Sequence, residues 1–303
     1  MNRLTNRLRV QRNQSSILRL CARFQMIYLR VVPPPGGKGK PDHFYHFIFD
    51  LLLPLFKVIS KAPDSTTFLV GGLGPFGAVL ERAFPGRVQV LQPRLRLNEV
   101  PESKGKHSLV GMNPRNCFLF RREILVFRDH VVAALDAQRH PAPNRVLLIE
   151  RLPPQQYYVE KGKSTSGAGR RSIRNHAQLL DHLGTVFGPQ VDVVNLHLEN
   201  LSLCEQIHYF SSARIVIAQH GAALANIIWM QAETLVVELS SNPGDDHFST
   251  LCRIMGIHHH LYSCDSDHPR IDCDHFVTWL QAVGIAPDKV ATRRDVPTLE
   301  QDA

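Results

Sequence analysis

A histidine-glycine-alanine turn between two apolar runs has the residue types best suited to chemistry. His220 follows the first run, and Glu238 lies near the end of the second. An imidazole exchanges a proton near neutral pH, and a carboxylate accepts hydrogen bonds. Gly221 and Ala222 come next after His220 and are small enough for a phosphate group to approach the backbone at a helix N-terminus. These residues predict a site for a phosphorylated ligand.

The segments around this turn predict a strand, a helix and a second strand. Residues 215–218 and 235–239 are short apolar runs typical of buried strands, and residues 222–230 have the length and composition of a helix. A crossover helix makes the two strands parallel, so their carboxyl ends lie at the same edge of one sheet. Because ligands of open α/β sheets bind at that edge, we expect His220 and Glu238 to flank one pocket.

A basic insertion follows an earlier strand of the same predicted sheet. It spans residues 152–171 and is rich in lysine, arginine, glycine and serine. Guanidinium groups make bidentate contacts with phosphate oxygens, so Arg151 and Arg171 are candidate ligands of a diphosphate. The alternative interpretation is a surface loop whose arginines form ordinary salt bridges.

The alternation of segments predicts an α/β protein with two halves. Turn-forming residues at 138–144 mark a linker, and the regular alternation after it is typical of a doubly wound, Rossmann-like domain. We predict a basic N-terminal arm at 1–30, an N-terminal α/β lobe at 31–140, a C-terminal Rossmann-like lobe at 141–290 and a tail at 291–303. The predicted strands are 67–70, 87–91, 146–149, 191–196, 215–218 and 235–239, and the predicted helices are 42–60, 78–84, 129–137, 175–183, 202–210 and 222–230.

Net charge and composition limit the classes of partner that we expect for this chain. The 303 residues carry a formal charge of +8, which favours an anionic partner such as a phosphorylated small molecule, a nucleic acid or a membrane surface. A nucleic-acid partner is not expected, because the chain lacks aromatic platforms and recognition motifs. No apolar stretch reaches eighteen residues, and residues 1–30 lack the pattern of a signal peptide, so no integral membrane segment is predicted. A membrane-surface helix at 3–30 remains the alternative to a fraying arm.

Cysteine and histidine spacings give no metal-site signature. The six cysteines include no C-x-x-C pair, which argues against a zinc ribbon, and a disulfide between Cys264 and Cys273 stays open. Histidines crowd the region 258–275 without a recognised ligand spacing, so we interpret them as scattered surface residues. The glycine-rich segment 71–77 lacks the spacing of a dinucleotide fingerprint, and we interpret it as a loop that could lie near a ligand.

The chain resembles glycosyltransferase family 61 in an ordered series of motifs. The series covers residues 145–242 well and the first half more loosely, through the segment from His46 to Pro54. Four positions depart from the family pattern: Glu150 stands in place of serine, His176 in place of glutamate and Ala223 in place of glycine, and no arginine follows Pro54. The matching residues are Ile149 and Arg151, then Arg171, Ile173 and Asn175, then Leu203, Glu205, Gln206 and Ile207, and finally His220, Gly221, Ala222, Asn226 and Val237, Glu238 and Leu239.

The resemblance implies a glycosyltransferase with two Rossmann-like lobes of the GT-B type. It implies an inverting transfer, without a metal or other cofactor, from a nucleoside-diphosphate sugar, with UDP as the expected nucleotide, to a hydroxyl of a glycan or glycoprotein. The alternative is a catalytically degenerate relative that only binds a nucleotide or glycan. The resemblance also implies the secretory pathway, whereas a chain complete as given would be cytoplasmic.

The same resemblance assigns roles to the candidate residues. Glu238 would accept hydrogen bonds from ribose, and His220 would contact the diphosphate or sugar; a strand-end carboxylate meeting water and a packed loop histidine are the alternatives. Asn226 would orient the turn, with a purely structural role as the alternative. The acceptor base would come from the N-terminal, acceptor-side lobe, where His46 and Asp50 lie four residues apart on one helical face. A satisfied core histidine is the competing interpretation of His46.

A metal-dependent transferase is the rival enzyme class. It would need an Asp-x-Asp motif, which Asp265 and Asp267 supply. This motif follows the last predicted core strand instead of ending a strand in mid-chain, so its position argues against that class.

Overall fold

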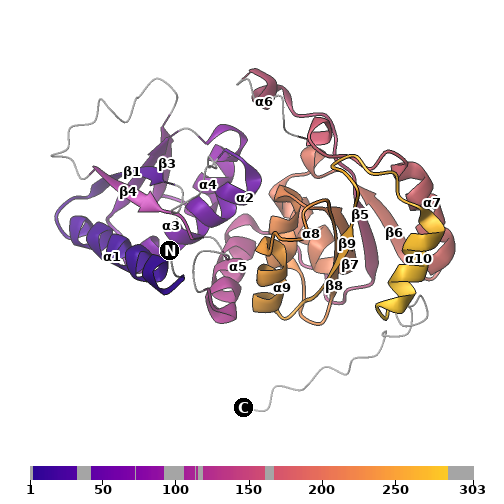
Figure 1. Ribbon diagram of the computed structural model, residues 1–303. Helices are drawn as coiled ribbons and strands as arrows, with labels where there is room; N and C mark the ends of the chain where they lie inside the picture. The colour runs from indigo at the N-terminus through magenta and orange to yellow at the C-terminus, as the bar shows by residue number, and fades with distance from the viewer. Residues whose placement is uncertain are drawn as a thin grey trace, which may run out of the picture.

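Two parallel sheets lie side by side, one in each half of the chain (Figure 1). The computed structural model describes residues 3–32, 42–71, 73–91, 106–112, 114, 119–160 and 167–285. Expectations for the basic residues at 161–166, for Cys117 and for the tail at 291–303 fall outside these ranges. The predicted α/β class is confirmed, because all strand pairs in both sheets are parallel and helices connect them.

The first half is built on a four-stranded sheet with the order β3-β2-β1-β4. Because β1 pairs with β2 on one side and with β4 on the other, the strand order reverses between β1 and β4. Such a switch point is where open α/β sheets offer a crevice to ligands. The strands are β1 (Met26–Val32), β2 (Thr67–Gly71), β3 (Val88–Leu91) and β4 (Lys106–Val110).

The apolar segment predicted as one helix over 42–60 is a helix of three parts. It begins as α2 (Phe44–His46), widens into the π-helical turn η1 (Phe47–Leu52) and continues as α3 (Leu53–Ile59). Pro54 lies in the first turn of α3, where its missing N–H group is tolerated, and the π-helical turn comes directly before it. The other helices of this half are α1 (Arg3–Cys21), η2 (Gly74–Phe76), α4 (Gly77–Ala83) and α5 (Arg121–Leu135).

The prediction of a basic arm at 1–30 is wrong. Residues 3–21 form α1, which packs against β4 and α3 and buries Val10 and Ile17, and β1 is an inner strand of the sheet. Asn13 ties the helix to β4, because its side chain donates to the Ser108 carbonyl and accepts from the Val110 amide. The arginines concealed this role, since only one narrow stripe of α1 is apolar.

The second half contains a five-stranded sheet with the order β6-β5-β7-β8-β9. Its switch point lies between β5 and β7, so the residues that follow these two strands share one crevice. The four strands predicted for this half are confirmed, whereas β9 was not predicted. The strands are β5 (Arg145–Ile149), β6 (Asp192–Leu196), β7 (Ala213–Gln219), β8 (Leu235–Ser240) and β9 (His258–Ser263).

Helices cover both faces of the second sheet. Apolar residues alternate between the faces along each strand, so Leu148 and Ile217 pack with α7 and α10, whereas Leu147 and Val216 pack on the opposite face with α8, η7 and α9. The segment predicted as a helix after β7 is a 3-10 helix, η7, and α9 and α10 were not predicted. The elements are α6 (Gln156–Glu160), η5 (Gly167–Gly169), α7 (His176–Phe187), η6 (Leu198–Asn200), α8 (Leu203–Ser212), η7 (Ala222–Trp229), α9 (His247–Met255) and α10 (Cys273–Ala282).

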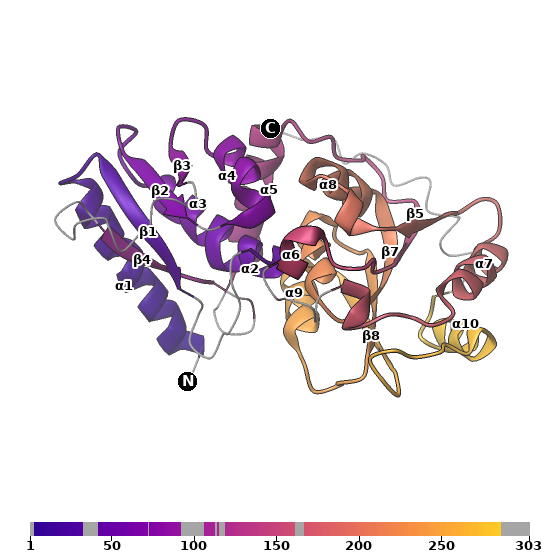
Figure 2. The ribbon, with the colours of Figure 1, turned by 90° about the horizontal axis from the view of Figure 1, so that it is seen from above.

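One hydrophobic core joins the two halves. Phe127 of α5 packs against Trp229 at the end of η7, with ring centroids 6.4 Å apart, and Trp229 is fully buried. Arg128 donates to the Met230 carbonyl at 3.3 Å, and α2 lies against η7. Figure 2 shows α2 at the boundary between the two halves. Large buried aromatic surfaces of this kind hold the halves in a fixed relation, which any site between them needs.

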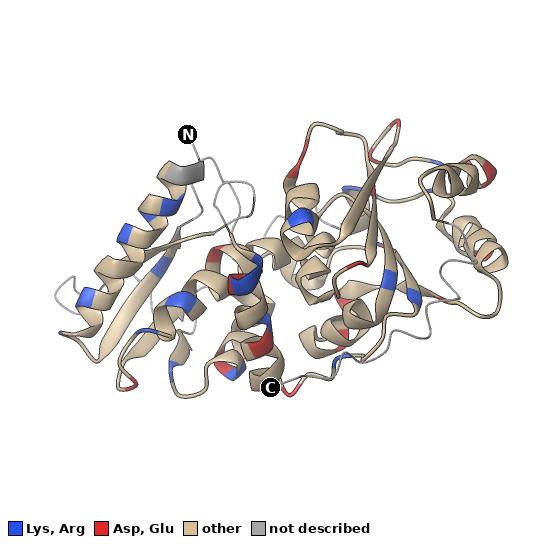
Figure 3. Cartoon of the chain, turned by 90° about the horizontal axis from the view of Figure 1, so that it is seen from below, with Lys and Arg blue, Asp and Glu red and all other residues tan. Residues whose placement is uncertain are grey.

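The charged residues do not gather on a single element. Lysines and arginines occur along α1 and on both halves of the chain (Figure 3). Within the described ranges, no helix combines the length and apolar character needed to cross a bilayer. Cys264 and Cys273 are free thiols, so the disulfide considered for them is not formed.

Candidate functional site

The turn after β7 has a backbone that only glycine fits easily. Gly221 has φ +154°, a value that L-residues rarely adopt. A Cβ atom at this position would also overlap the guanidinium of Arg151. Gly221 therefore lets an arginine approach the start of η7 closely, and the turn presents a backbone edge next to a positive charge.

Two arginines converge on this turn. Arg151 Nη2 and Arg171 Nη1 each donate to the carbonyl oxygen of His220 at 3.0 Å. Burial, together with the positive charges of Arg171 and Arg170, lowers the pKa of Arg151 to about 10. Arg171 Nε lies 3.0 Å from Asp267 Oδ1, whereas Arg151 has no carboxylate at ion-pair distance among the described residues. The cluster carries surplus positive charge, so an anion bound here would relieve the repulsion between the guanidinium groups.

Behind the turn, one buried carboxylate holds two imidazoles. Glu238 Oε1 lies 2.5 Å from His220 Nδ1, and Glu238 Oε2 lies 2.7 Å from His259 Nε2. Burial pushes the pKa of Glu238 up, but the hydrogen bonds from His220 and His259 outweigh burial and hold it below its ordinary value. The Glu238 side chain is only 1% exposed. This burial argues against the ribose contact predicted for Glu238 and assigns it the orientation of His220 instead.

His259 is a site residue that the sequence interpretation missed. It lies in β9, and its side chain is 14% exposed, so it is not a scattered surface histidine. The strand itself was the missing signal, because β9 pairs with β8 and brings alternate residues of 258–263 beside Glu238. The other nitrogen of the His220 ring, Nε2, lies 3.5 Å from Asp245 Oδ2.

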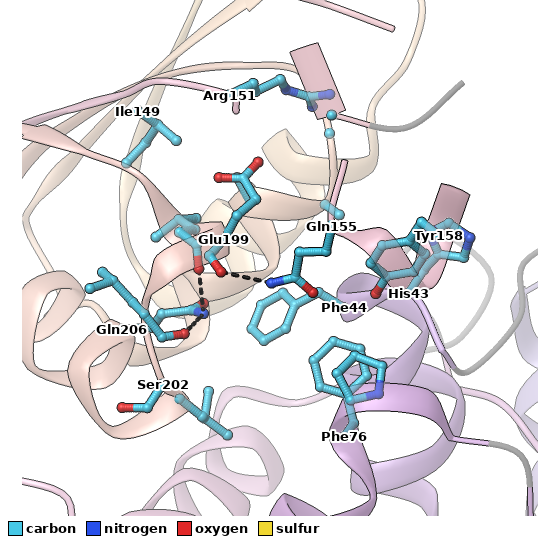
Figure 4. Close-up of a pocket in the computed structure, with 18 of the residues that line it drawn as sticks. His43, Phe44, Phe76, Ile149, Arg151, Gln155, Tyr158, Glu199, Ser202 and Gln206 are labelled. Atoms are coloured by element: carbon cyan, nitrogen blue, oxygen red, sulfur yellow. Dashed lines mark hydrogen bonds between the residues drawn. The ribbon is translucent and has the colours of Figure 1, made fainter. Parts of the chain in front are cut away.

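A cavity of about 630 Å³ lies where the two halves meet (Figure 4). Aromatic side chains from the first half face the second, and His43 stacks on Tyr158 with ring centroids 5.3 Å apart. The α6 segment closes over this side, since Tyr158 donates to the Asp42 carbonyl at 2.7 Å. The lining includes His43, Phe44, Pro75 and Phe76 from the first half and Glu150, Arg151, Gln155, Tyr158, Arg170, Glu199, Ser202, Gln206, Gly221, Ala222 and Ala223 from the second.

The predicted donor-binding residues divide into two groups around this cavity. Arg151, Gly221 and Ala222 line it, and the glycine-rich loop predicted near a ligand contributes Pro75 and Phe76. His220 and Arg171 hold the turn from outside the cavity lining. His220 and Glu238 point toward one another, as expected from their places in the βαβ unit.

Asn226 is part of the interior of η7. Its side chain is fully buried, and Asn226 Nδ2 donates to Gln206 Oε1 at 3.0 Å while its Oδ1 accepts from Trp229 Nε1 at 3.0 Å. Asn226 Nδ2 also donates to the Ala223 carbonyl. These bonds satisfy the polar groups of an otherwise apolar segment, so the structural alternative fits Asn226 and direct donor contact does not.

His46 and Asp50 form a hydrogen-bonded pair in the first half. His46 Nδ1 lies 2.7 Å from Asp50 Oδ2 across one turn of the helical segment. Burial raises the pKa of Asp50, and the hydrogen bond from His46 opposes that rise. The carboxylate fits because Gly111 has no side chain where Asp50 Oδ1 lies. Among the described residues, Nε2 of His46 and Oδ1 of Asp50 have no hydrogen-bond partner.

The pair lies next to the cavity without lining it. His46 follows Tyr45, whose ring packs 5.4 Å from that of His247 and 6.0 Å from that of Phe248. The ring of Phe248 is in turn 5.1 Å from that of His220. These contacts connect the histidine of α2 with the histidine of the β7 turn across the boundary between the halves.

No metal centre is found in the described part of the chain, where no group of three or more His, Cys, Asp and Glu side chains is arranged to hold an ion. The Asp-x-Asp motif follows β9, and its Asp267 accepts hydrogen bonds from Arg171 at 3.0 Å and from the Ser241 hydroxyl at 2.8 Å.

These features define an α/β protein with a cavity beside an arginine cluster at the switch point of its second sheet. The family described as Glycosyltransferase 61 matches residues 44–237, and the chain belongs to this family. The resemblance seen in the sequence motifs is thereby confirmed.

Curated relatives extend the comparison. The chain is 30% identical over 89 residues to the EGF domain-specific O-linked N-acetylglucosamine transferase of Gallus gallus, covering 29% of this chain and 17% of that protein. It is 24% identical over 270 residues to the Protein O-linked-mannose beta-1,4-N-acetylglucosaminyltransferase 2 of Mus musculus, covering 76% of this chain and 43% of the relative. The corresponding Bos taurus protein is 23% identical over 270 residues, with the same two shares. The chain thus spans less than half the length of these relatives.

Proposed function

We propose that this protein transfers a sugar, with inversion and without a metal ion, from a UDP-sugar to a hydroxyl of a glycan or glycoprotein. In this proposal the two halves act as the two lobes of a GT-B-type enzyme, and the donor occupies the cavity between them. The observation that carries the proposal is the meeting of Arg151 and the Gly221 turn in a cavity of about 630 Å³ at the β5/β7 switch point.

The diphosphate of the donor would lie against the turn. Arg151 supplies a guanidinium group that is already close to two other positive side chains, and the start of η7 supplies backbone amides. Developing negative charge on the leaving diphosphate is stabilised most by donors that are fixed in place before the reaction. Arg171 and the His220–Glu238 pair keep this turn fixed, so they act as positioning residues.

The acceptor hydroxyl would lose its proton to His46. A general base must be able to take a proton on a free ring nitrogen, and the Asp50 carboxyl group bound at Nδ1 leaves Nε2 of His46 as that atom. His220 is less suited to this role, because Glu238 and Asp245 lie close to its two ring nitrogens. Deprotonation by His46, attack of the acceptor oxygen on the anomeric carbon and departure of UDP complete a balanced inverting transfer.

The names of the relatives support a first choice of donor. By name, all three transfer N-acetylglucosamine, one to EGF domains and two to protein O-linked mannose, so UDP-N-acetylglucosamine is the first donor to test. The aromatic residues of the first half that face the cavity, Phe44 and Phe76, fit an acceptor that contains a sugar ring.

The test combines binding and turnover. We expect UDP and UDP-sugars to raise the melting temperature, because a ligand at a hundred times its Kd stabilises the folded state by about 2.7 kcal/mol. We also expect sugar transfer to a glycopeptide to persist in excess chelator. Binding without transfer or hydrolysis would favour the degenerate alternative, and loss of transfer on chelation would contradict the metal-independent mechanism.

A further inference from the structure

Two carboxylates line the cavity, Glu150 and Glu199, and Glu150 has no part in the reaction described above. It follows β5 directly, at the switch point, and its side chain is 34% exposed. Glu238, the carboxylate predicted from the sequence to meet the donor, is 1% exposed. Of Glu150 and Glu238, Glu150 is the one that a ligand in the cavity can touch.

One carboxylate oxygen of Glu150, Oε2, interacts with side chains that do not line the cavity. Oε2 accepts a hydrogen bond from Asn195 Nδ2 at 2.7 Å and lies 2.6 Å from His197 Nε2. His176 Nε2 in turn lies 2.9 Å from Asn195 Oδ1 and 3.8 Å from Glu150 Oε2. Oε1 has no hydrogen-bond partner among the described residues, so it remains available as an acceptor.

The surroundings keep Glu150 ionised. Burial pushes its pKa up, but the hydrogen bonds from Asn195 and His197 outweigh burial and hold the pKa below its ordinary value. An ionised carboxylate only accepts hydrogen bonds. It therefore favours a ligand that presents a hydroxyl group and disfavours one that presents a carboxylate or another phosphate.

Two departures from the family pattern meet in this network. Glu150 stands where the family has serine and His176 where it has glutamate, and these two side chains approach to 3.8 Å. Glu150 lines the cavity, whereas the side chain of His176 is 8% exposed.

We propose that Glu150 is a specificity-determining residue whose free carboxylate oxygen binds a hydroxyl group of the donor. The hydroxyl belongs either to the ribose or to the transferred sugar. This inference rests on the proposed function, because it requires a nucleotide sugar in the cavity. A site built to accept a hydroxyl hydrogen bond discriminates strongly against a ligand that lacks it, since the site group is then left unpaired.

The experiment is a set of titrations of wild type and Glu150→Gln. The ligands are UDP, its 2′-deoxy and 3′-deoxy analogues, and UDP-N-acetylglucosamine. If the ribose is bound, the substitution weakens UDP about tenfold and leaves one of the deoxy analogues unchanged. If the sugar is bound, UDP is unchanged and only UDP-N-acetylglucosamine weakens about tenfold. Affinities within about twofold of wild type for all four ligands would overturn the inference.

Glu233→Gln is the matched control. Glu233 also faces a histidine, His258, at 3.3 Å, but its side chain is 68% exposed and it does not line the cavity. All four affinities should stay at the wild-type value. Failure of the wild type to bind any of the four ligands would instead contradict the proposed function, and this inference would fall with it.

A double variant covers the case in which Glu150→Gln does not fold. Glu150→Ser alone should lower the melting temperature, because Asn195 and His197 lose their partner. Adding His176→Glu returns a carboxylate to this network from α7, so the melting temperature should recover while affinity stays about tenfold below wild type. Wild-type affinity in the folded double variant would overturn the role of Glu150.

Discussion

The guanidinium group of Arg151 occupies the space that the Cβ atom of a side chain at Gly221 would fill. The close approach brings the end of β5 and the end of β7 together, and it places a positive charge beside the start of η7. The expected effects of substitution in and around the cavity follow from this arrangement.

Gly221→Ala should disturb the donor site directly. The new Cβ displaces Arg151 and forces a non-glycine residue to φ +154°, which costs about 1–3 kcal/mol of backbone strain. We expect the affinity for UDP, measured by calorimetry, to fall at least tenfold. Gly184→Ala is the control, because Gly184 lies inside α7 with nothing near its missing Cβ. That change should leave UDP binding intact, and equal effects of the two substitutions would contradict the arrangement.

His46→Gln separates chemistry from binding. If His46 is the base, its loss lowers the transfer rate by about 10²- to 10⁴-fold, the usual contribution of proton transfer to a positioned side chain. The Kd for UDP should not change, because His46 does not line the cavity. His182→Gln, at a partly exposed position on α7 facing Asp274, should leave both quantities unaltered. A transfer rate close to wild type in His46→Gln would remove His46 from the mechanism.

Asp50→Asn should raise the melting temperature and lower the rate of sugar transfer. Burial raises the pKa of Asp50 above 3.8, so its contribution to stability is present below pH 3.8 and is lost as the pH rises through the folded-state pKa. Asparagine carries no charge to bury and can still accept from His46. At pH 7 the variant should melt at least about 2 °C higher than wild type while transfer falls about 10²-fold.

The pH dependence of the melting temperature tests the direction of the pKa shift of Asp50. The melting-temperature advantage of Asp50→Asn should shrink as the pH is lowered through the raised folded-state pKa of Asp50, because protonation of the wild-type carboxylate removes the buried charge. An advantage that grows on acidification would mean that the carboxylate is stabilised in its ionised form.

Ile17→Ala tests whether α1 belongs to the fold. Ile17 is fully buried between the helix and the first sheet, and truncation of such a side chain costs about 2–5 kcal/mol. Chemical denaturation should detect this loss. Arg12→Ala on the exposed face of α1 should change stability by less than about 0.5 kcal/mol. A neutral Ile17→Ala would indicate an arm that does not pack.

The sequence predicted the elements whose apolar residues lie at buried positions. The strands β5 to β8 are short apolar runs bounded by turns, and the Ser202 capping box at the start of α8 is formed as its spacing predicted. β9 escaped prediction because its sequence, HHHLYS, is half polar and half-buried. α1 escaped it because arginines surround a narrow apolar stripe.

For the candidate site, the sequence predicted which residues lie next to each other better than it predicted what each residue does. It placed His220 beside Glu238 and paired His46 with Asp50, since both follow from regular strand and helix geometry. It did not predict that His259 would close off Glu238, because that contact depends on the pairing of an unrecognised strand. Nor did it predict that Glu150 would face the cavity, which depends on how the two halves meet.

The proposed function depends on a nucleoside diphosphate that binds against Arg151. The direct measurement is calorimetric titration of UDP into wild type and Arg151→Lys, which keeps the charge but loses the planar, bidentate donor. We expect saturable binding of UDP to wild type and an affinity at least about tenfold lower in the variant. Equal affinities for UDP would contradict this binding mode.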